Sequence, residues 1–292
     1  MKVVRTISDV RAALAAPRRR GSAIGLVPTM GAFHDGHLSL MCHARDECDL
    51  IVVSLFVNPT QFNESSDLIA YPRDEARDAR LAAEVGVDYL FAPPVNEIYP
   101  HGFTTTVSVA GITETLEGAH RGRAHFDGVT TVVTKLCNIV APDVVYFGQK
   151  DAQQVAVIRR LVRDLDIPVR IRVCATVRDP DGLALSSRNA LLSADERARA
   201  TALNRALQAA RDAVAGGERD PRSVSAIARA ELTGADVAPE YLELVSADTM
   251  IPVRRVDGDT LAVVAARLGS TRLIDNHLLS TRMAGSSDDR RH

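Results

Sequence analysis

The chain between residues 27 and 40 decides the fold, and it reads Val27-Pro28-Thr29-Met30-Gly31-Ala32-Phe33-His34-Asp35-Gly36-His37-Leu38-Ser39-Leu40. A short apolar run, residues 23–27, leads into it. Leu38, Met41 and Ala44 then repeat at helical spacing. This change of period predicts a strand, a loop and a helix in succession.

The loop, residues 28–37, carries two glycines and two histidines. Gly31 and Gly36 let the backbone approach a ligand closely, and His34 and His37 lie three residues apart where the helix begins. Backbone N–H groups at a helix start attract an anion, and imidazoles can donate hydrogen bonds to phosphate oxygens. The same pair is compatible with a metal half-site or with two helix-capping side chains. The glycine-rich turn between strand and helix favours a nucleotide site.

Length and composition describe an ordinary globular chain. Its 292 residues suffice for two domains, and 46% are hydrophobic and 25% charged. A net charge of −2 gives no basic surface for nucleic acid or an anionic membrane. The longest apolar run, residues 50–57, is too short to span a bilayer, and the N-terminus lacks a signal-peptide core. We expect a cytoplasmic enzyme with no nucleic-acid or membrane partner.

The four cysteines lack Cys-x-x-Cys spacing and lie in apolar periodic segments. We expect buried thiols without a chemical role at Cys42, Cys48, Cys137 and Cys174.

Strand and helix signals alternate as far as residue 174. We expect strands at 23–27, 50–57, 88–92, 144–147 and 169–174, and helices at 7–15, 71–85, 128–140 and 148–164. The nearly continuous apolar run at 50–57 is typical of a parallel strand covered on both faces. The sequence therefore predicts an α/β domain with a parallel sheet at residues 1–176.

The composition changes after Ser193. We expect helices at 194–215 and from the Gly216-Gly217 break to 232, followed by strands at 241–245 and 261–266 around a turn at 257–259. This pattern predicts a smaller α+β domain with antiparallel pairing, residues 177–280, and a disordered tail, residues 281–292.

Polar residues follow the predicted strand 50–57. Because strand carboxyl ends carry the sites of parallel sheets, Asn58 and Gln61 can bind neutral polar groups of a substrate beside the histidine loop. The alternative is that Asn58-Pro59 is simply a turn.

A second possible phosphate site follows the strand 144–147. Gly148 turns the chain, and Lys150 lies at a helix start beside Asp151 and Gln154. Lysine is rare here, since only Lys2, Lys135 and Lys150 occur among 35 basic residues. An exposed Lys-Asp pair in the first helical turn is the alternative.

A third possible phosphate site ends the polar loop 178–189. Ser186-Ser187-Arg188 combines two hydroxyls with a guanidinium that can hold a polyphosphate bidentately. The alternative is a commonplace surface segment.

Taken together, these segments resemble the pantoate–β-alanine ligases, a family of the nucleotidyltransferase superfamily with its His-x-Gly-His signature. The resemblance covers residues 28–40, 56–62, 71–73, 116–135, 147–154, 177–188 and 271–276. It implies a Rossmann-like domain at 1–176 that binds ATP and pantoate, a lid-like domain at 177–280, and a homodimer. The implied reaction uses ATP and Mg²⁺ to convert pantoate to pantoyl adenylate, which β-alanine then attacks to give pantothenate and AMP.

The resemblance also implies roles for individual residues. It assigns catalysis to His34, His37, Lys150, Ser186 and Arg188, all of which contact ATP or stabilise phosphate charge. Further ATP-site positions are Pro28, Met30, Phe147, Gly148, Asp151, Val177 and Ser187, and pantoate-binding positions are Asn58, Gln61 and Gln154.

The chain departs from the family pattern at two places. The family often has adjacent acidic residues where Arg77 precedes Asp78, which leaves Asp78 as the candidate Mg²⁺ ligand. The segment 116–126 is one residue longer than the family's, so that either Arg121 or Arg123 fills the family's arginine position.

Two other functions share parts of these motifs. A cytidylyl- or adenylyltransferase shares the histidine loop, and a non-catalytic nucleotide-binding regulator would share the fold. Neither has reason to keep Asn58 and Gln61 together with Lys150 and the segment 186–188.

Overall fold

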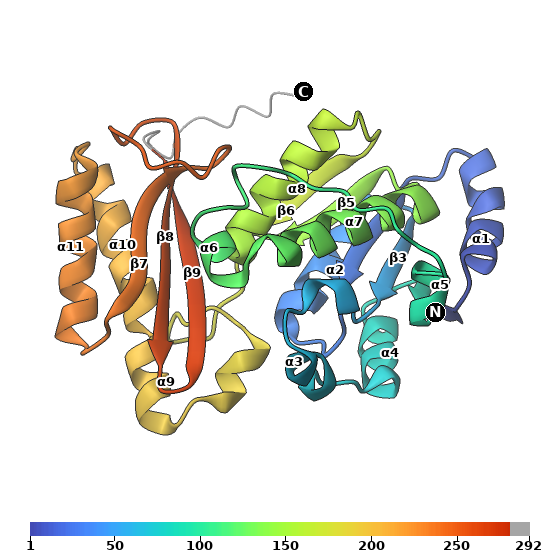
Figure 1. Ribbon diagram of the computed structural model, residues 1–292, viewed down its shortest axis with the longest axis horizontal. Helices are drawn as coiled ribbons and strands as arrows, with labels where there is room; N and C mark the ends of the chain where they lie inside the picture. Colours follow the sequence, from blue (N-terminus) through green and yellow to red (C-terminus); the bar gives the residue numbers. More distant parts are fainter. Residues whose placement is uncertain (281–292) are drawn as a thin grey trace. The chain divides into compact units, whose positions relative to one another are not determined.

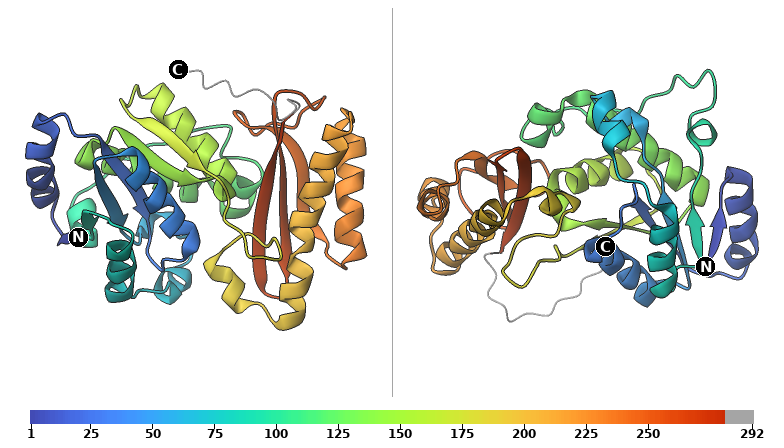
Figure 2. Two further views of the ribbon diagram at one scale, coloured as in Figure 1. Left: turned by 180° about the vertical axis from the view of Figure 1, so that it is seen from behind. Right: turned by 90° about the horizontal axis from the view of Figure 1, so that it is seen from below.

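The computed structural model describes residues 1–280 and divides into two compact units (Figures 1 and 2). Among the described residues, unit 1 comprises residues 1–177 and 185–187, and unit 2 comprises residues 178–184 and 188–280. The chain therefore passes from one unit to the other after residues 177, 184 and 187. The sequence pattern placed the boundary after 176 and did not reveal the return of 185–187.

Unit 1 is built on a sheet in which all neighbouring strands are parallel, in the order β1-β4-β3-β2-β5-β6. The strands are β1 Lys2–Val4, β2 Ile24–Thr29, β3 Leu50–Leu55, β4 Tyr89–Phe91, β5 Val144–Gly148 and β6 Arg170–Cys174. The predicted α/β class with a parallel sheet is confirmed, and the short edge strand β1 is an addition.

Helices cover both faces of this sheet (Figure 1). They are α1 Ile7–Arg19, α2 Asp35–Glu47, α3 Ser65–Ala70, α4 Glu75–Glu84, α5 Val95–Ile98, α6 Glu117–Arg121, α7 Arg123–Val140 and α8 Ala152–Asp164, with 3₁₀ turns η1 Pro59–Gln61 and η2 Gln149–Asp151. Along β2, Leu26 packs with α1, α7 and α8, whereas Val27 packs with α2 and α4. Successive strand residues point to opposite faces, so both faces of β2 need an apolar cover.

The order of the strands positions the site. Strand β2 pairs with β3 on one side and with β5 on the other, so the chain changes direction of winding there. In open parallel sheets, ligands bind at such a switch point, outside the carboxyl ends of the strands. The loops that follow β2, β3 and β5 carry, in turn, His34 with His37, Asn58 with Gln61, and Lys150.

Unit 2 has an antiparallel sheet in the order β7-β8-β9, which confirms the predicted α+β character. Its elements are α9 Ala194–Ala200, α10 Ala202–Ala215, α11 Pro221–Gly234, β7 Pro239–Ser246, β8 Asp259–Leu268 and β9 Thr271–Ser280, preceded by the 3₁₀ turn η3 Ser187–Leu191. The predicted helix 194–215 is broken at Thr201, and β9 was not predicted as a strand. The predicted disordered tail, residues 281–292, lies outside the described residues.

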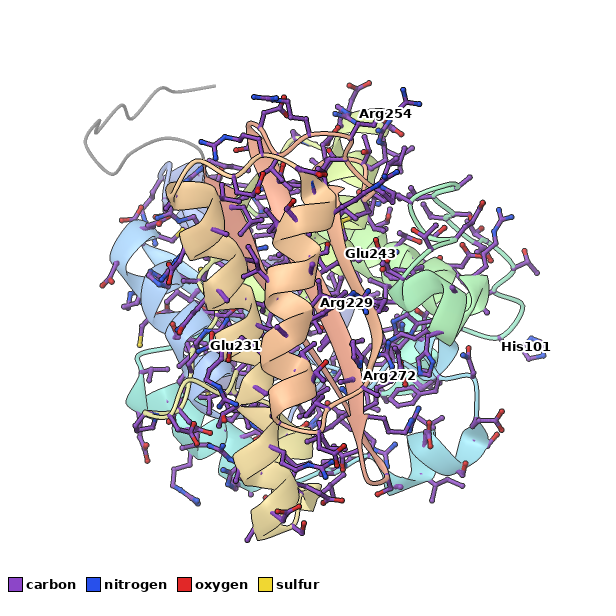
Figure 3. The ribbon with its side chains drawn as sticks, turned by 90° about the vertical axis from the view of Figure 1, so that its left-hand side faces the viewer. His101, Arg229, Glu231, Glu243, Arg254 and Arg272 are labelled. Atoms are coloured by element: carbon purple, nitrogen blue, oxygen red, sulfur yellow. The ribbon has the colours of Figure 1, made fainter. Side chains whose placement is uncertain are left out.

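Helices α10 and α11 cover one face of this sheet through Leu203, Leu207 and Val224 (Figure 3). Arg229 of α11 donates to the carbonyl oxygen of Leu242 at 3.0 Å and thereby ties the helix to β7. Unit 2 therefore has a core of its own.

Candidate active site

The two histidines of the loop after β2 cap helix α2. His34 is the N-cap residue, and its Nδ1 accepts a hydrogen bond from the backbone N–H of Gly36 at 3.1 Å. The Nδ1 atom of His37 accepts from the backbone N–H of His34 at 3.4 Å, and the ring centroids lie 4.2 Å apart. The capping interpretation is therefore correct, but it uses only one nitrogen of each ring.

These bonds fix the tautomer of both imidazoles. Because each Nδ1 accepts a backbone hydrogen, the ring proton of the neutral form lies on Nε2. Burial, followed by the charge of Lys150, lowers the pKa of His34 below its ordinary value. Burial and the neighbouring His34 lower the pKa of His37 to about 3. Both histidines are thus neutral at physiological pH, and each offers an Nε2–H as a donor.

Lys150 lies close enough to the histidines for its charge to act on both rings, as does the opposite charge of Asp151. Both residues belong to η2, which follows β5 directly, rather than to the first turn of α8. The loops after β2 and β5 therefore come together, because the two strands are parallel neighbours and their carboxyl ends meet at one edge of the sheet. Phe147 lies in the core with 4% of its surface exposed, so only its backbone can face a ligand.

In the turn after β3, the side-chain amide of Asn58 forms its hydrogen bonds within the protein. Asn58 is 1% exposed, and its Nδ2 donates to Gln61 Oε1 and to the carbonyl oxygen of Gly128, each at 3.1 Å. Its Oδ1 accepts from the hydroxyls of Thr60 and Tyr99, each at 2.9 Å. The turn interpretation of Asn58 is thus supported, because both polar atoms are used within the protein.

Gln61 is half-buried and is placed by Asn58. Its Nε2 lies 2.9 Å from the sulfur of Met30 in the histidine loop, so the turns after β2 and β3 are also in contact. Helix α7 packs very closely against this turn at Gly128. A Cβ atom at that position would lie 2.5 Å from the carbonyl oxygen of Thr60.

Two neighbouring glutamines begin α8. Gln154 is half-buried. Gln153 is buried, accepts from the backbone N–H of Glu117, and donates to the carbonyl oxygens of Ile112 and Thr115. Gln153 therefore holds the segment before α6, a role that the sequence did not indicate.

Four predicted ATP-site residues, Val177, Ser186, Ser187 and Arg188, lie where the chain passes between the two units. Pro28 lies in β2, and Gly148 ends β5. Leu185 N–H donates to the carbonyl oxygen of Val177 at 2.9 Å within unit 1, and Ser186 and Ser187 follow directly. Arg188 is exposed and begins the return to unit 2. Its predicted place beside the phosphates stays a prediction.

Asp78, the candidate Mg²⁺ ligand, is 1% exposed and faces the histidine loop. Its Oδ2 accepts from the backbone N–H of Ala32, and its Oδ1 from that of Phe33, each at 2.8 Å. The guanidinium of Arg77 lies 3.7 Å away. Among residues 1–280, no group of three His, Cys, Asp or Glu side chains is arranged to hold a metal ion.

Sequence reasoning also missed residues that support the turn after β3. Tyr99 contacts Asn58 from 41 positions away, and His125 Nδ1 lies 2.8 Å from the carbonyl oxygen of Gln61. The charge of Arg121 contributes to lowering the pKa of His125, after burial, so Arg121 lies near this turn. Arg123 contacts Ser108 instead. No local pattern signals these long-range contacts.

A cavity of about 420 Å³ opens at the other end of the sheet, where β2, β5 and β6 begin. Arg18, Glu47, Asp143 and Arg170 contribute to its lining, and it contains none of the predicted site residues.

The fold and the site together define a class. A parallel sheet with a His-x-Gly-His loop at its switch point, next to a lysine turn, is the arrangement of an enzyme of the nucleotidyltransferase superfamily. The family is shown by a model described as pantoate-β-alanine ligase, which matches residues 2–278. The chain belongs to the pantoate-β-alanine ligase family.

Relatives agree over nearly the full length. The chain is 53% identical over 274 residues to the pantothenate synthetase of Cereibacter sphaeroides, which covers 94% of this chain and 98% of the relative. It is 50% identical over 280 residues to that of Moorella thermoacetica, with 96% and 99% covered. A crystal structure of the Thermus thermophilus enzyme has a TM-score of 0.90 at 45% identity, covering 96% of this chain and 100% of that one.

A pantoate-β-alanine ligase from Francisella tularensis, solved in complex with beta-gamma ATP and β-alanine, has a TM-score of 0.78 at 34% identity, with 96% and 98% covered. The reaction of the family is the ATP-dependent condensation of pantoate with β-alanine to pantothenate. Within residues 1–280, no helix combines the length and apolar character needed to cross a membrane.

Proposed function

We propose that unit 1 carries out the adenylation step with His34, His37 and Lys150 bound to the phosphates of ATP. A carboxylate oxygen of pantoate attacks the α-phosphorus, a new O–P bond forms, and the bond to the bridging oxygen breaks as pyrophosphate leaves. The amine of β-alanine then attacks the acyl carbon, AMP leaves with the electron pair of the acyl C–O bond, and the amine loses a proton.

The observation that carries this proposal is the pair of neutral imidazoles beside Lys150 at the switch point. The nucleophile is already a carboxylate and pyrophosphate is already a leaving group, so the step needs orientation and charge stabilisation more than proton transfer. Two Nε2–H donors and one ammonium supply both without a histidine acting as an acid or base.

The pantoate site is proposed at Gln61 and Gln154, with Asn58 holding Gln61 in place. A half-buried amide offers both a donor and an acceptor, which suits the hydroxyl and carboxylate groups of the acid. The support is the contact of Gln61 with Met30, because it places the amide beside the loop proposed to hold ATP.

The remaining ATP contacts are proposed from the resemblance. Ser186, Ser187 and Arg188 are assigned to the phosphates, and Pro28, Met30, Phe147, Gly148, Asp151 and Val177 to the nucleotide. Binding of ATP and β-alanine is supported by the Francisella tularensis complex. The homodimer and the cytoplasmic location rest on the family resemblance and on composition.

Asp78 does not fit the role of an Mg²⁺ ligand. Both of its carboxylate oxygens accept backbone N–H groups, and an arginine lies beside it. Mg²⁺ is commonly held by substrate phosphates and waters with only one or two carboxylates. We therefore assign Mg²⁺ to the phosphates of ATP and derive no step from a protein ligand.

Isotope exchange tests the proposal. The wild-type chain should exchange labelled pyrophosphate into ATP when pantoate is present and β-alanine is absent, and the complete reaction should release AMP. Omission of pantoate should abolish the exchange. Strict dependence of the exchange on β-alanine, or release of ADP, would contradict the stepwise adenylation.

A further inference from the structure

Helix α4 grips the backbone of the histidine loop through two adjacent side chains, Arg77 and Asp78, which we call the α4 clasp. Asp78 accepts from the N–H groups of Ala32 and Phe33 at 2.8 Å each. Arg77 donates to the carbonyl oxygen of Phe33 at 3.0 Å. Three backbone groups directly before His34 are thus bound by two residues that are more than forty positions away in sequence.

The backbone held by the clasp is in an unfavourable conformation. Gly31 has a φ of 91°, and Ala32 has a φ of 53° although it is not a glycine. A non-glycine residue in this left-handed region is strained and persists where its surroundings impose it. The clasp supplies such surroundings, and there is no room for a side chain at Gly31, where a Cβ atom would lie 2.9 Å from Asp78 Oδ2.

The held segment leads directly to the histidines. Phe33 is 1% exposed, and its ring lies 5.6 Å from that of His37 between centroids. The next residue, His34, caps α2 in an extended conformation and donates its N–H to His37. A shift of the Ala32–Phe33 backbone would therefore move both imidazoles.

We infer that Asp78, assisted by Arg77, is a positioning residue that holds the Nε2–H donors of His34 and His37 in the geometry needed for adenylation. The inference rests on the function proposed above. A buried carboxylate is costly unless hydrogen-bonded, and here its two bonds go to the loop that carries the predicted phosphate donors. Misplacement of a catalytic group by about 1 Å can reduce a rate about 10²-fold. We therefore expect loss of the Asp78 carboxylate to affect the rate of adenylation more than the stability of the fold.

The test uses Asp78→Asn, which is nearly isosteric but turns an NH₂ group toward one of the two backbone donors. Its matched control is Asp143→Asn, since Asp143 also accepts a backbone N–H at a β2 residue, Ile24, but at the other end of the strand. Pantoate-dependent pyrophosphate exchange should fall about 10–100-fold in Asp78→Asn and stay within about twofold of wild type in the control. The loss should fall on kcat rather than on the KM of pantoate.

A double-mutant cycle with His34→Asn separates positioning from a merely structural role. If Asp78 acts through the imidazole, Asp78→Asn should reduce the exchange much less in the His34→Asn background than in the wild-type chain. An equal reduction in both backgrounds would overturn the inference.

A milder variant keeps the inference testable if Asp78→Asn does not fold. Arg77 is half-exposed, and Arg77→Met removes its bond to Phe33 and its ion pair with Asp78 but keeps both backbone bonds of Asp78. It should lower the exchange several-fold, again with little further effect in the His34→Asn background. Unchanged exchange in Arg77→Met with folded protein would count against the clasp. Failure of the wild-type chain to exchange at all would instead contradict the proposed function.

Discussion

The turns after β2 and β3 are built alike, but their capping residues have different capacity left for a substrate. His34 caps α2 and Asn58 caps η1, each through a side-chain acceptor. The imidazole uses Nδ1 for the cap and keeps Nε2–H, whereas the amide of Asn58 uses Oδ1 and Nδ2 within the protein. The comparison teaches that a residue can cap a helix and bind a ligand only if it has a second, independent polar atom.

The largest expected effect comes from removing that second atom at the β2 turn. In His34→Asn, the amide oxygen can still cap α2, but the distal donor is lost. Exchange of pyrophosphate into ATP should fall about 10²–10³-fold, as for one lost transition-state donor, while the midpoint of urea unfolding stays close to wild type. His34→Ala should show the same loss of rate and an additional loss of about 1 kcal/mol of stability. Near-wild-type exchange in His34→Asn would remove the histidine from the mechanism.

The β3 turn should respond to the equivalent change mainly in stability. Asn58→Ala removes the side-chain donor to the buried carbonyl oxygen of Gly128 and the amide acceptor of the Tyr99 hydroxyl, which should lower the free energy of unfolding by about 1–3 kcal/mol. Urea unfolding measures this loss, and Asn96→Ala at an exposed position of α5 is the control. A stable Asn58→Ala protein with impaired pantoate binding alone would show that the amide contacts the substrate directly.

A smaller effect is expected at Gln61. Gln61→Ala should raise the KM of pantoate about tenfold, the worth of about one neutral hydrogen bond, and leave the KM of ATP unchanged. Saturation kinetics with each substrate will show the difference. Equal changes in both constants would place Gln61 between the two sites instead.

The smallest effect concerns pH. Because both imidazoles are already neutral, protonation of a histidine should not change kcat/KM for ATP near pH 6.5. The pH profiles of the wild-type chain and of His34→Asn should therefore have the same shape in this range. Stability should respond in a defined direction. The folded pKa of His37, about 3, lies below its ordinary 6.5, so only the unfolded chain binds the proton between these values. Stability should therefore decrease as the pH falls below about 6.5. A change in kcat/KM near pH 6.5 that is present in the wild-type chain and absent from His34→Asn would show that the protonation state of His34 matters for activity.

Local patterns were sufficient to predict the strands and loops of unit 1 that carry the proposed site. The change of period at the histidine loop and the apolar runs of β3 and β5 predicted strands whose carboxyl ends lie side by side. The family resemblance assigned His34, His37 and Lys150 to the same phosphates, and in the structure the charge of Lys150 acts on both imidazoles. The same reasoning missed β9, because Asp275 and Asn276 interrupt its apolar alternation.

Long-range contacts determine the site features that the sequence did not predict. The role of Asn58 depends on Tyr99 and Gly128, and that of Asp78 depends on the backbone of Ala32 and Phe33. Such pairings are set by how helices pack on the sheet, and hydrophobic periodicity does not specify which polar atoms they bring together. Asp78 was therefore a candidate ligand only through the family's acidic pattern at this place, whereas in the structure its carboxylate accepts two backbone N–H groups.

The crossings after residues 177, 184 and 187 restrict how this protein can be divided. Neither unit is one continuous piece of chain, since unit 1 includes Leu185–Ser187, which are enclosed in sequence by segments of unit 2. A gene fragment ending at Val177 encodes an N-terminal unit without the two serines assigned to ATP. A fragment that starts at Arg188 encodes a C-terminal unit without its hairpin, in which Arg178 forms a bidentate ion pair with Asp275 at 2.6 and 2.9 Å. A single cut in the gene therefore cannot separate the two units without leaving a segment of one unit in the other fragment.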